Sequence, residues 1–342
     1  MLSKRKLQVL KAVVQSYVES GSPVGSRTLT KEYNLGVSAA TIRNEMADLE
    51  DLGLLEQPYT SAGRIPSDKG YRLYVDSLMP KNKIKRNEVK RIENEIDKVI
   101  LDKEKLVANI ADALAELTSY ATIFSGPNVG ACKLQEFSII PINENTIIVV
   151  LIADNGMSSN KTIHLPQPLS QEEIHFINRI LNYGFKGRYL GEIKEEEKEK
   201  ILETISSYLT RENIHLKNIL DQMIAIHNAP SITNSAVNVV SQPEFRMGEK
   251  YLELLQVLTT KEHLLNILNP VNFAKKDNLQ IVIGKEIDID NMEDCSIVKV
   301  SYTIDNRIAG ALGVIGPKRM DYSKVVALLN YTSDRLKDAL KE

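Results

Sequence analysis

The sequence predicts a multidomain protein of the α+β class. With 342 residues, the chain is longer than a single hydrophobic core usually supports. Before residue 121, apolar side chains recur mainly at helical spacing. From residue 121 onward, several runs are rich in β-branched residues and are bounded by turn-forming sequences. We therefore expect a helical amino-terminal domain followed by domains that contain β-sheet.

The composition excludes several classes of protein. Hydrophobic residues at 43% and charged residues at 26% lie in the globular range. No run approaches the roughly 18 apolar residues of a membrane span, and residues 1–15 are amphipathic and lack a signal-peptide core. Cys132 and Cys295 stand alone, and the five histidines lack the spacing of metal ligands. We expect a cytoplasmic protein with reduced thiols, no membrane association and no bound metal.

Motifs of the common enzyme classes are absent from the sequence. It contains no P-loop GxxxxGK[ST], no HExxH, no GxSxG and no dinucleotide-binding GxGxxG. The sequence therefore predicts neither catalytic residues nor a cofactor. Charge is unevenly distributed: residues 1–91 carry 16 Lys and Arg against 10 Asp and Glu, so the remainder is acidic. The amino-terminal end is the better candidate for binding nucleic acid.

Two helices joined to a third by a short turn are predicted near the amino terminus. The first helix carries an apolar stripe and ends at the Gly21-Ser22-Pro23 run. The stripe consists of Leu7, Leu10, Val13, Val14, Tyr17 and Val18. Ser26 is a favourable N-cap for a second helix over 27–33. Gly36 suits a left-handed turn, and Ser38 can cap the next helix, which gives a helix-turn-helix.

The third helix, over 39–51, separates into two faces. Ile42, Met46 and Leu49 should pack inward. The outward residues are Ala40, Arg43, Asn44 and Ala47. Small residues let the backbone approach a base edge, while Arg43 matches guanine and Asn44 matches adenine in the major groove. The carboxyl-terminal half is acidic, which predicts that the amino-terminal half enters the groove. The alternative is a helix that only packs a small domain.

A strand-turn-strand unit follows and predicts a wing. A strand is expected over 54–58 after the Gly53 helix stop, with a tip over 59–63. Arg64 leaves this tip and suits phosphate or minor-groove contact, although an ion pair with a carboxylate is its alternative role. Ser67 and Asp68 should open a further helix over 69–79. The predicted DNA-contacting residues are Ser26, Arg27, Ser38, Ala39, Ala40, Thr41, Arg43, Asn44, Ser61, Gly63, Arg64 and Lys69.

The rest of the chain predicts a split domain with an insertion. A charged helical linker over 81–100 leads into a helix through about residue 120, with an apolar stripe at Ile92, Ile96, Val99 and Leu106. This helix either pairs between subunits or covers the next sheet. Strands are expected at 121–125, 134–141, 146–153, 235–240, 279–283, 296–304 and 308–314, with a 305–306 turn. Helices are expected near 170–182, 195–209 and 212–227, and from Tyr322.

Several motifs resemble a known family. The runs VGSRTL, SAATIRNEMADLEDLGLLEQP and TSAGRIPSDKGYRLYVD, over residues 24–76, resemble the amino-terminal region of the HrcA family of heat-inducible transcription repressors. IGPKRMDYSKVVALLNY, over 315–331, is similar to the closing segment of that family. Tyr59 stands where many members have histidine, and Ser67 where threonine is common. These departures affect only the detail of the wing contact.

The resemblance implies a domain plan and a function. It implies a winged helix-turn-helix at 1–80, a linker at 81–100, and a GAF-like domain at 101–157 and 246–342, interrupted by an inserted dimerising domain at 158–245. It further implies a homodimer that binds double-stranded DNA at the inverted-repeat CIRCE operator and represses chaperone operons of the GroE and DnaK type. Heat relieves repression in that family, and the chaperonin GroEL is an implied partner.

Two alternatives remain open from the sequence. One is a winged-helix regulator that senses a metabolite in the GAF-like domain, and the other is an interaction protein that does not bind DNA. No apolar run with convergent polar groups identifies a ligand site, so the sequence favours a structural role for the GAF-like domain.

Overall fold

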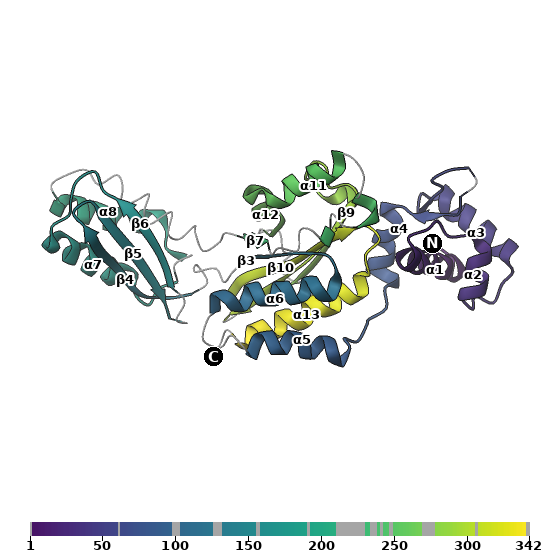
Figure 1. The fold of residues 1–342 in the computed structure, drawn as a ribbon, viewed down its shortest axis with the longest axis horizontal. Helices are drawn as coiled ribbons and strands as arrows, with labels where there is room; N and C mark the ends of the chain where they lie inside the picture. Colours follow the sequence, from purple (N-terminus) through teal and green to yellow (C-terminus); the bar gives the residue numbers. More distant parts are fainter. Residues whose placement is uncertain are drawn as a thin grey trace.

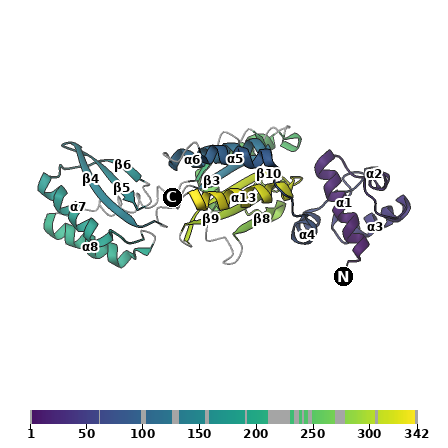
Figure 2. The same cartoon turned by 90° about the horizontal axis from the view of Figure 1, so that it is seen from below.

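The computed structural model shows a mixed α+β chain with antiparallel sheets, as predicted (Figure 1). It describes residues 2–60, 62–97, 103–125, 132–154, 158–189, 192–209, 230–232, 238–239, 242–245, 249–268, 278–304 and 307–339. Two views show the same elongated arrangement (Figures 1 and 2). The amino-terminal helices lie at one end, a three-stranded sheet lies at the other, and a five-stranded sheet with its helices lies between them.

The amino-terminal unit, residues 2–79, consists of helices and one short hairpin. Its elements are α1 Lys4–Ser20, α2 Ser26–Glu32, α3 Ala39–Asp51, β1 Leu55–Glu56, β2 Ile65–Pro66, α4 Asp68–Leu73 and the π-helix η1 Tyr74–Leu78. The Ser3 side chain caps α1, and Gly21, with a φ of 66°, ends it. β1 and β2 pair antiparallel. The predicted order of helices and hairpin is therefore present.

One local prediction in this unit is wrong, and one predicted helix changes its geometry partway. Ser26 is the first residue of α2, and the N-cap is Gly25, which offers no side-chain hydrogen bond. The Ser26 carbonyl instead accepts a hydrogen bond from the Thr30 hydroxyl at 2.8 Å. The single helix expected over 69–79 begins at Asp68 and changes at Tyr74 to π geometry. Ser67 caps it, accepting a hydrogen bond from the Gly70 N–H at 3.1 Å.

The five-stranded unit has helices on both faces of one sheet. Its strand order is β7-β3-β10-β9-β8, and the described pairs are antiparallel. The strands are β3 Ala121–Ser125, β7 Pro230–Ile232, β8 Leu279–Ile283, β9 Cys295–Ile304 and β10 Arg307–Pro317. The helices are α5 Arg86–Asp97, α6 Lys103–Thr118 and α13 Tyr322–Ala339 on one face, and α11 Glu249–Thr259 and α12 Lys261–Leu268 on the other (Figure 1).

The segment predicted as a charged linker belongs partly to this unit. Ile92 and Ile96 of α5 are buried in a core shared with α6 and α13. Helix α5 therefore packs against these two helices and is not a solvent-exposed linker. Val99 lies outside the described residues. On the same helix, the Glu93 carboxylate accepts a hydrogen bond from the Tyr331 hydroxyl at 2.8 Å. Within this chain Ile92 and Ile96 pack against α6 and α13, and pairing of this stripe between subunits stays a prediction.

The three-stranded unit forms a separate core. Strands β4 Leu134–Asn143, β5 Thr146–Ala153 and β6 Ser158–His164 are antiparallel, and helices α7 Gln171–Phe185 and α8 Glu195–Leu209 cover one face. Two asparagines of α7 bind the backbone of β4: the Phe137 N–H donates to Asn182 at 2.9 Å and the Ile139 N–H to Asn178 at 2.8 Å. The two amides thus accept hydrogen bonds from backbone N–H groups of β4, a strand at the edge of the sheet.

The strand pairing changes the expected division of the chain. A boundary at residues 157 and 158 would separate β5 from β6, although the two strands pair along their length. β3, in contrast, pairs with β10 and β7 in the five-stranded sheet. Residues 238–239 are helical rather than the expected strand, and the helix predicted at 212–227 lies outside the described residues. The division therefore falls between Ser125 and Leu134.

No described helix is long and apolar enough to cross a membrane. Within the same ranges, no group of three or more His, Cys, Asp or Glu is arranged to hold a metal ion. Cys132 and Cys295 are buried free thiols.

Candidate nucleic-acid interface

Helix α3 lies on the outer side of the amino-terminal unit, away from the five-stranded unit (Figures 1 and 2). Its start is fixed by Ser38, whose hydroxyl accepts a hydrogen bond from the Thr41 N–H at 3.2 Å. Gly36 adopts the left-handed conformation that the turn requires, with a φ of 67°. The inward residues Ile42, Met46 and Leu49 are all buried, as their spacing predicts. Since packing fixes the inward face, the opposite face of α3 is held toward solvent.

The amino-terminal half of α3 presents small residues together with two long polar side chains. Ala40, Arg43 and Asn44 are exposed, and Ala39 and Thr41 are partly buried beside them. No ion pair or hydrogen bond of the Arg43 or Asn44 side chain occurs in the described part of the chain. Both side chains are consequently available to an external partner. Their hydrogen-bond donors and acceptors are of the kind that bind base edges.

The carboxyl-terminal half of α3 is acidic, and three carboxylates of the helix form ion pairs. Arg5 lies 3.7 Å from Glu45, and Lys6 lies 2.9 Å from Asp48. The Asp48 hydrogen bond raises the pKa of Lys6 above its usual value. Arg64 pairs with Glu50 at 2.7 Å. These contacts lessen the repulsion that the acidic half would exert on a phosphate backbone, and they join α1 and the hairpin to α3.

The hairpin is fastened to the chain that precedes α2. Val24 and Arg64 exchange two backbone hydrogen bonds of 2.9 Å, which add a bridge beside the β1–β2 pair. A side chain at Gly63 would meet this neighbouring backbone, because its Cβ would lie 2.8 Å from the carbonyl carbon of Pro23. Gln57 holds the tip by donating from its amide to the Thr60 carbonyl at 2.9 Å. Ser61, also expected at this tip, lies outside the described residues.

Arg64 occupies a different place from the one expected. Its Nε donates to Glu50 at 2.8 Å, and its side chain is only 21% exposed. The guanidinium thus forms the carboxylate ion pair that the sequence left as its alternative role. Arg64 consequently ties the hairpin to the end of α3, rather than projecting freely from the tip.

The remaining predicted contacts lie on two further helices. Arg27 is exposed on α2 and Ser26 is partly buried beside it. Lys69 is exposed on α4, the helix that lies between α3 and the five-stranded unit in Figure 1. The structure therefore groups Ser38 to Asn44 on one helix end, whereas Lys69 belongs to a more distant element.

Sequence reasoning missed a polar junction between α4 and the five-stranded unit. Asp68 accepts a hydrogen bond from Lys318 Nζ at 2.9 Å and another from the Lys285 N–H at 3.2 Å. Arg72 forms a bidentate pair with Glu286, with Nε at 2.9 Å from Oε1, and also donates to the Ile281 carbonyl at 2.6 Å. Arg72 and Glu286 are 214 positions apart, so no local pattern could indicate the contact.

An apolar contact lies beneath this polar junction. The Tyr71 ring lies 6.0 Å from the Tyr322 ring, centroid to centroid, within one core that extends from α1 to α13. Tyr71 is 1% exposed, and its hydroxyl has no hydrogen-bond partner among the described residues. Burial holds the pKa of Tyr71 well above its usual value, so the hydroxyl stays neutral. The amino-terminal unit is thereby joined to the five-stranded unit by a shared core.

Comparison with known proteins identifies the family. The model of the HrcA protein C-terminal domain matches residues 104–326. Heat-inducible transcription repressor HrcA of Moorella thermoacetica is 36% identical over 343 residues, covering 100% of this chain and 98% of that protein. The Bacillus pumilus protein of the same name is 34% identical, covering 99% and 98%. A crystal structure described as a hypothetical protein aligns over 100% and 99% of the two chains, with a TM-score of 0.60 at 23% identity, which supports the fold. The chain belongs to the HrcA family of heat-inducible transcription repressors.

Proposed function

We propose that this chain is a dimeric repressor that binds an inverted-repeat operator of the CIRCE type and silences chaperone operons of the GroE and DnaK type. The observation that carries the proposal is the exposed amino-terminal half of α3, where Arg43 and Asn44 have no partner in the described chain. Membership of the HrcA family supports the class of regulated gene. Heat would lower the population of the binding-competent dimer, and GroEL is the partner that the family resemblance implies.

The amino-terminal unit is, in this proposal, the winged helix-turn-helix. Arg43 binds guanine O6 and N7, and Asn44 binds adenine N6 and N7, while Ala39 and Ala40 permit close approach. The hydroxyls of Ser38 and Thr41, together with Ser26, Arg27, Ser61, Gly63 and Lys69, are proposed for backbone contacts. Arg64 acts by positioning the wing, because its guanidinium already binds Glu50.

The other two units are assigned to architecture and assembly. The five-stranded unit is proposed as the GAF-like domain and the three-stranded unit as the inserted dimerising domain, beginning between Ser125 and Leu134. The sheet face opposite α7 carries an aliphatic stripe of Ile140, Ile148, Val150 and Ile152, of which Ile140 is 46% exposed. A second copy of this chain on that face would bury the stripe. The dimer would act in the cytoplasm, where the operator lies.

A symmetric dimer requires an operator whose two half-sites are related by a twofold axis. Two copies of α3 enter successive major grooves on one face of the duplex when the half-sites are related by the same twofold axis as the protein. A single half-site then engages only one helix. The protein should consequently prefer an inverted repeat to a half-site, and both to a scrambled sequence.

The decisive experiment measures binding of the full chain to three labelled duplexes by fluorescence anisotropy. These are an inverted repeat, a single half-site and a scrambled sequence of equal length. We expect tight binding of the first at one dimer per duplex, and a loss of this binding at heat-shock temperature. Equal binding of the inverted repeat and the scrambled duplex would refute operator recognition.

Assembly is tested separately by sedimentation. The Ile148→Asp variant should dissociate the dimer by placing a charge in the proposed apolar contact. Thr204→Asp, on the exposed side of α8, is the matched control and should remain dimeric. A dimer that survives Ile148→Asp would remove the β4–β5 face as the assembly surface, while leaving operator binding to its own test.

A further inference from the structure

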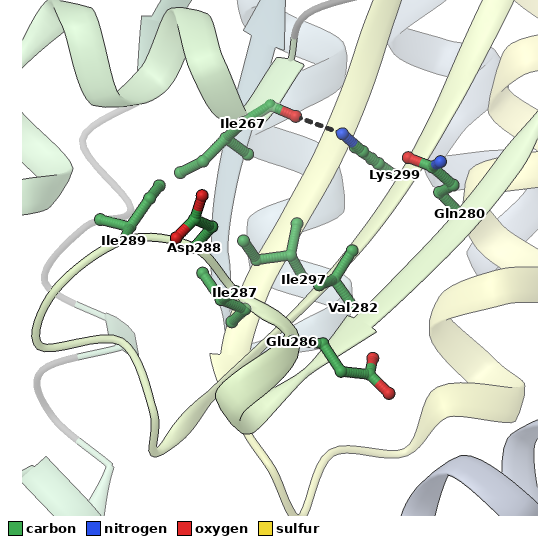
Figure 3. A pocket seen from close by; sticks show the side chains of 9 residues that line it. All are labelled: Ile267, Gln280, Val282, Glu286, Ile287, Asp288, Ile289, Ile297 and Lys299. Atoms are coloured by element: carbon green, nitrogen blue, oxygen red, sulfur yellow. Dashed lines mark hydrogen bonds between the residues drawn. The ribbon is translucent and has the colours of Figure 1, made fainter. Parts of the chain in front are cut away.

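We propose that the five-stranded unit contains a binding site for a small aliphatic carboxylate. The site is a cavity of about 360 Å³ on the face of the sheet that α12 covers, lined by β8, β9, α12 and the segment that follows β8 (Figure 3). Pockets that bind small molecules usually measure roughly 300 to 1,000 Å³. The volume suits a compact ligand.

Two cross-strand pairs form the floor of the cavity. Gln280 lies opposite Lys299, and Val282 lies opposite Ile297, in the antiparallel register of β8 and β9. The two positions on each strand are two residues apart, so all four side chains lie on the same face. The floor is therefore polar at one end, where it offers an ammonium and an amide, and aliphatic at the other.

The walls extend the aliphatic end. Ile287 and Ile289 lie on the segment after β8, and Figure 3 shows Ile287 close to Val282 and Ile297. Ile267 of α12 contributes the opposite wall. An apolar chain placed here would exchange water for aliphatic side chains on several sides, which is favourable in proportion to the area that it buries.

Lys299 supplies the charge that selects the head group. Its side chain is 5% exposed, and its Nζ donates a hydrogen bond of 2.7 Å to the Ile267 carbonyl in the last turn of α12. Burial lowers the pKa of Lys299 to about 8. A carboxylate at this end would favour the protonated lysine by direct Coulomb attraction in a poorly solvated place. A neutral isostere of the same shape would not.

The acidic residues of the lining do not oppose this arrangement. Glu286 and Asp288 are both exposed, so solvent screens their charges more than that of the buried Lys299. Glu286 is moreover engaged by Arg72 of α4. A ligand therefore enters with its carboxylate toward Lys299 and Gln280 and its chain toward Val282 and Ile297.

The position of the cavity gives ligand binding a further consequence. The wall residues Ile287 and Ile289 follow directly on the 3-10 turn η6 Gly284–Glu286, and this turn holds α4 through Lys285 and Glu286. A ligand that fixes this wall would also fix the turn, and would thereby shift operator affinity. This second effect rests on the proposed repressor function, whereas ligand binding itself does not.

The test is calorimetric titration of the full chain, without DNA, with butyrate, hexanoate and octanoate. Hexanamide, which has the same chain and no charge, is the ligand control. We expect saturable binding of at least one acid, and at least tenfold weaker binding of the amide. Lys299→Met should remove the preference for acid over amide, while Lys285→Met, which changes an exposed lysine outside the cavity, should leave it unchanged.

A second variant, at the aliphatic end, keeps the test valid if Lys299→Met fails to fold. Ile289→Phe narrows the cavity and should weaken octanoate more than butyrate. Failure of every acid to bind, equal affinity for hexanoate and hexanamide, or an acid preference that survives Lys299→Met would each overturn the proposal. The contact of Lys299 with the last turn of α12 would then be structural. The anisotropy series on operator DNA tests the repressor function independently of these titrations.

Discussion

The outer face of α3 and the junction between α4 and the five-stranded unit differ in how their parts are brought together. Ser38, Arg43 and Asn44 lie within the cap and the first two turns of α3, so one short segment builds the surface. At the junction, Arg72 meets Glu286 across 214 positions, and Asp68 meets Lys318 across 250. The exposed face of α3 is thus formed by one local segment, whereas the junction that holds the amino-terminal unit depends on distant parts of the chain.

The largest expected effect comes from crowding the junction. Gly284 has a φ of 56°, and a Cβ there would lie 2.6 Å from Cγ of Asp68. Gly284→Ala should therefore combine left-handed strain of about 1–2 kcal/mol with a steric conflict of about 1–3 kcal/mol, lowering the free energy of unfolding. Denaturant unfolding of the full chain measures the sum.

A matched glycine separates the two contributions. Gly187 has a φ of 77° and nothing within 4 Å of the position of a Cβ, so Gly187→Ala carries the backbone strain alone. The excess cost of Gly284→Ala over Gly187→Ala is the steric cost of the junction. If the two variants unfold alike, Asp68 yields readily and the junction is softer than its contacts suggest.

The next effect concerns the local surface. Arg43→Ala should weaken operator binding by about 1–3 kcal/mol and relax base preference at one position in each half-site. Arg179→Ala, on the exposed side of α7, is the control and should bind normally. Anisotropy against operators changed at single positions measures both effects. A uniform loss on every sequence would instead make Arg43 a phosphate contact.

A smaller effect, of opposite sign, is expected at the apolar base of the junction. Tyr71→Phe removes a buried hydroxyl without a described partner and should stabilise the fold by about 1 kcal/mol. Tyr322→Phe is the paired control, because the Tyr322 hydroxyl hydrogen-bonds Ser296 and Lys318, each at 2.7 Å. It should be destabilising. Similar losses in both variants would mean that the Tyr71 hydroxyl is satisfied in solution.

The smallest effect is a pH dependence at the exposed ion pair. Burial acts to raise the pKa of Glu286, but hydrogen bonds from Arg72 and the Ile283 N–H lower it below the usual 4.5. A depressed carboxylate pKa contributes stability above about pH 4.5, and this contribution is lost as pH falls through the lower folded value. Because the pair is largely solvated, it should be worth less than about 1 kcal/mol.

Glu286→Gln should abolish that contribution. The difference in unfolding free energy between wild type and variant should be constant near neutral pH and should shrink below about pH 4.5. A difference that persists undiminished in acid would show that Glu286 acts through packing rather than charge.

Sequence alone predicts the local features of this chain well. The i, i+4, i+7 spacing of Ile42, Met46 and Leu49 places them inward, and the structure buries all three. Ser38 caps α3 as predicted, because a cap depends on residues only three apart. Ser26 failed as a cap although it has the same chemistry, since the helix starts one residue earlier at a glycine N-cap.

The sequence pattern could not predict contacts between segments that are distant in the chain. Arg64 had both a phosphate role and a carboxylate role in the sequence, and only the fold brings Glu50 within 2.7 Å of it. The strands at 134–141 and 146–153 were assigned to the same domain as 121–125, because β-branched composition does not specify which sheet a strand joins. Lys299 appeared as one charge among apolar residues, and only the register of β8 and β9 reveals a cavity beside it.

The shared core beneath the junction limits how this repressor can be rebuilt. A fragment cut after residue 80 would carry the whole helix-turn-helix, yet it would expose Tyr71 and the charged residues of α4. A chimaera that joins the amino-terminal unit to a different protein therefore needs that protein to supply the equivalents of η6 and the start of α13. Excising the three-stranded unit would take two cuts, one between Ser125 and Leu134 and one beyond Leu209, because β3 pairs with β7 and β10 on the other side of the insertion.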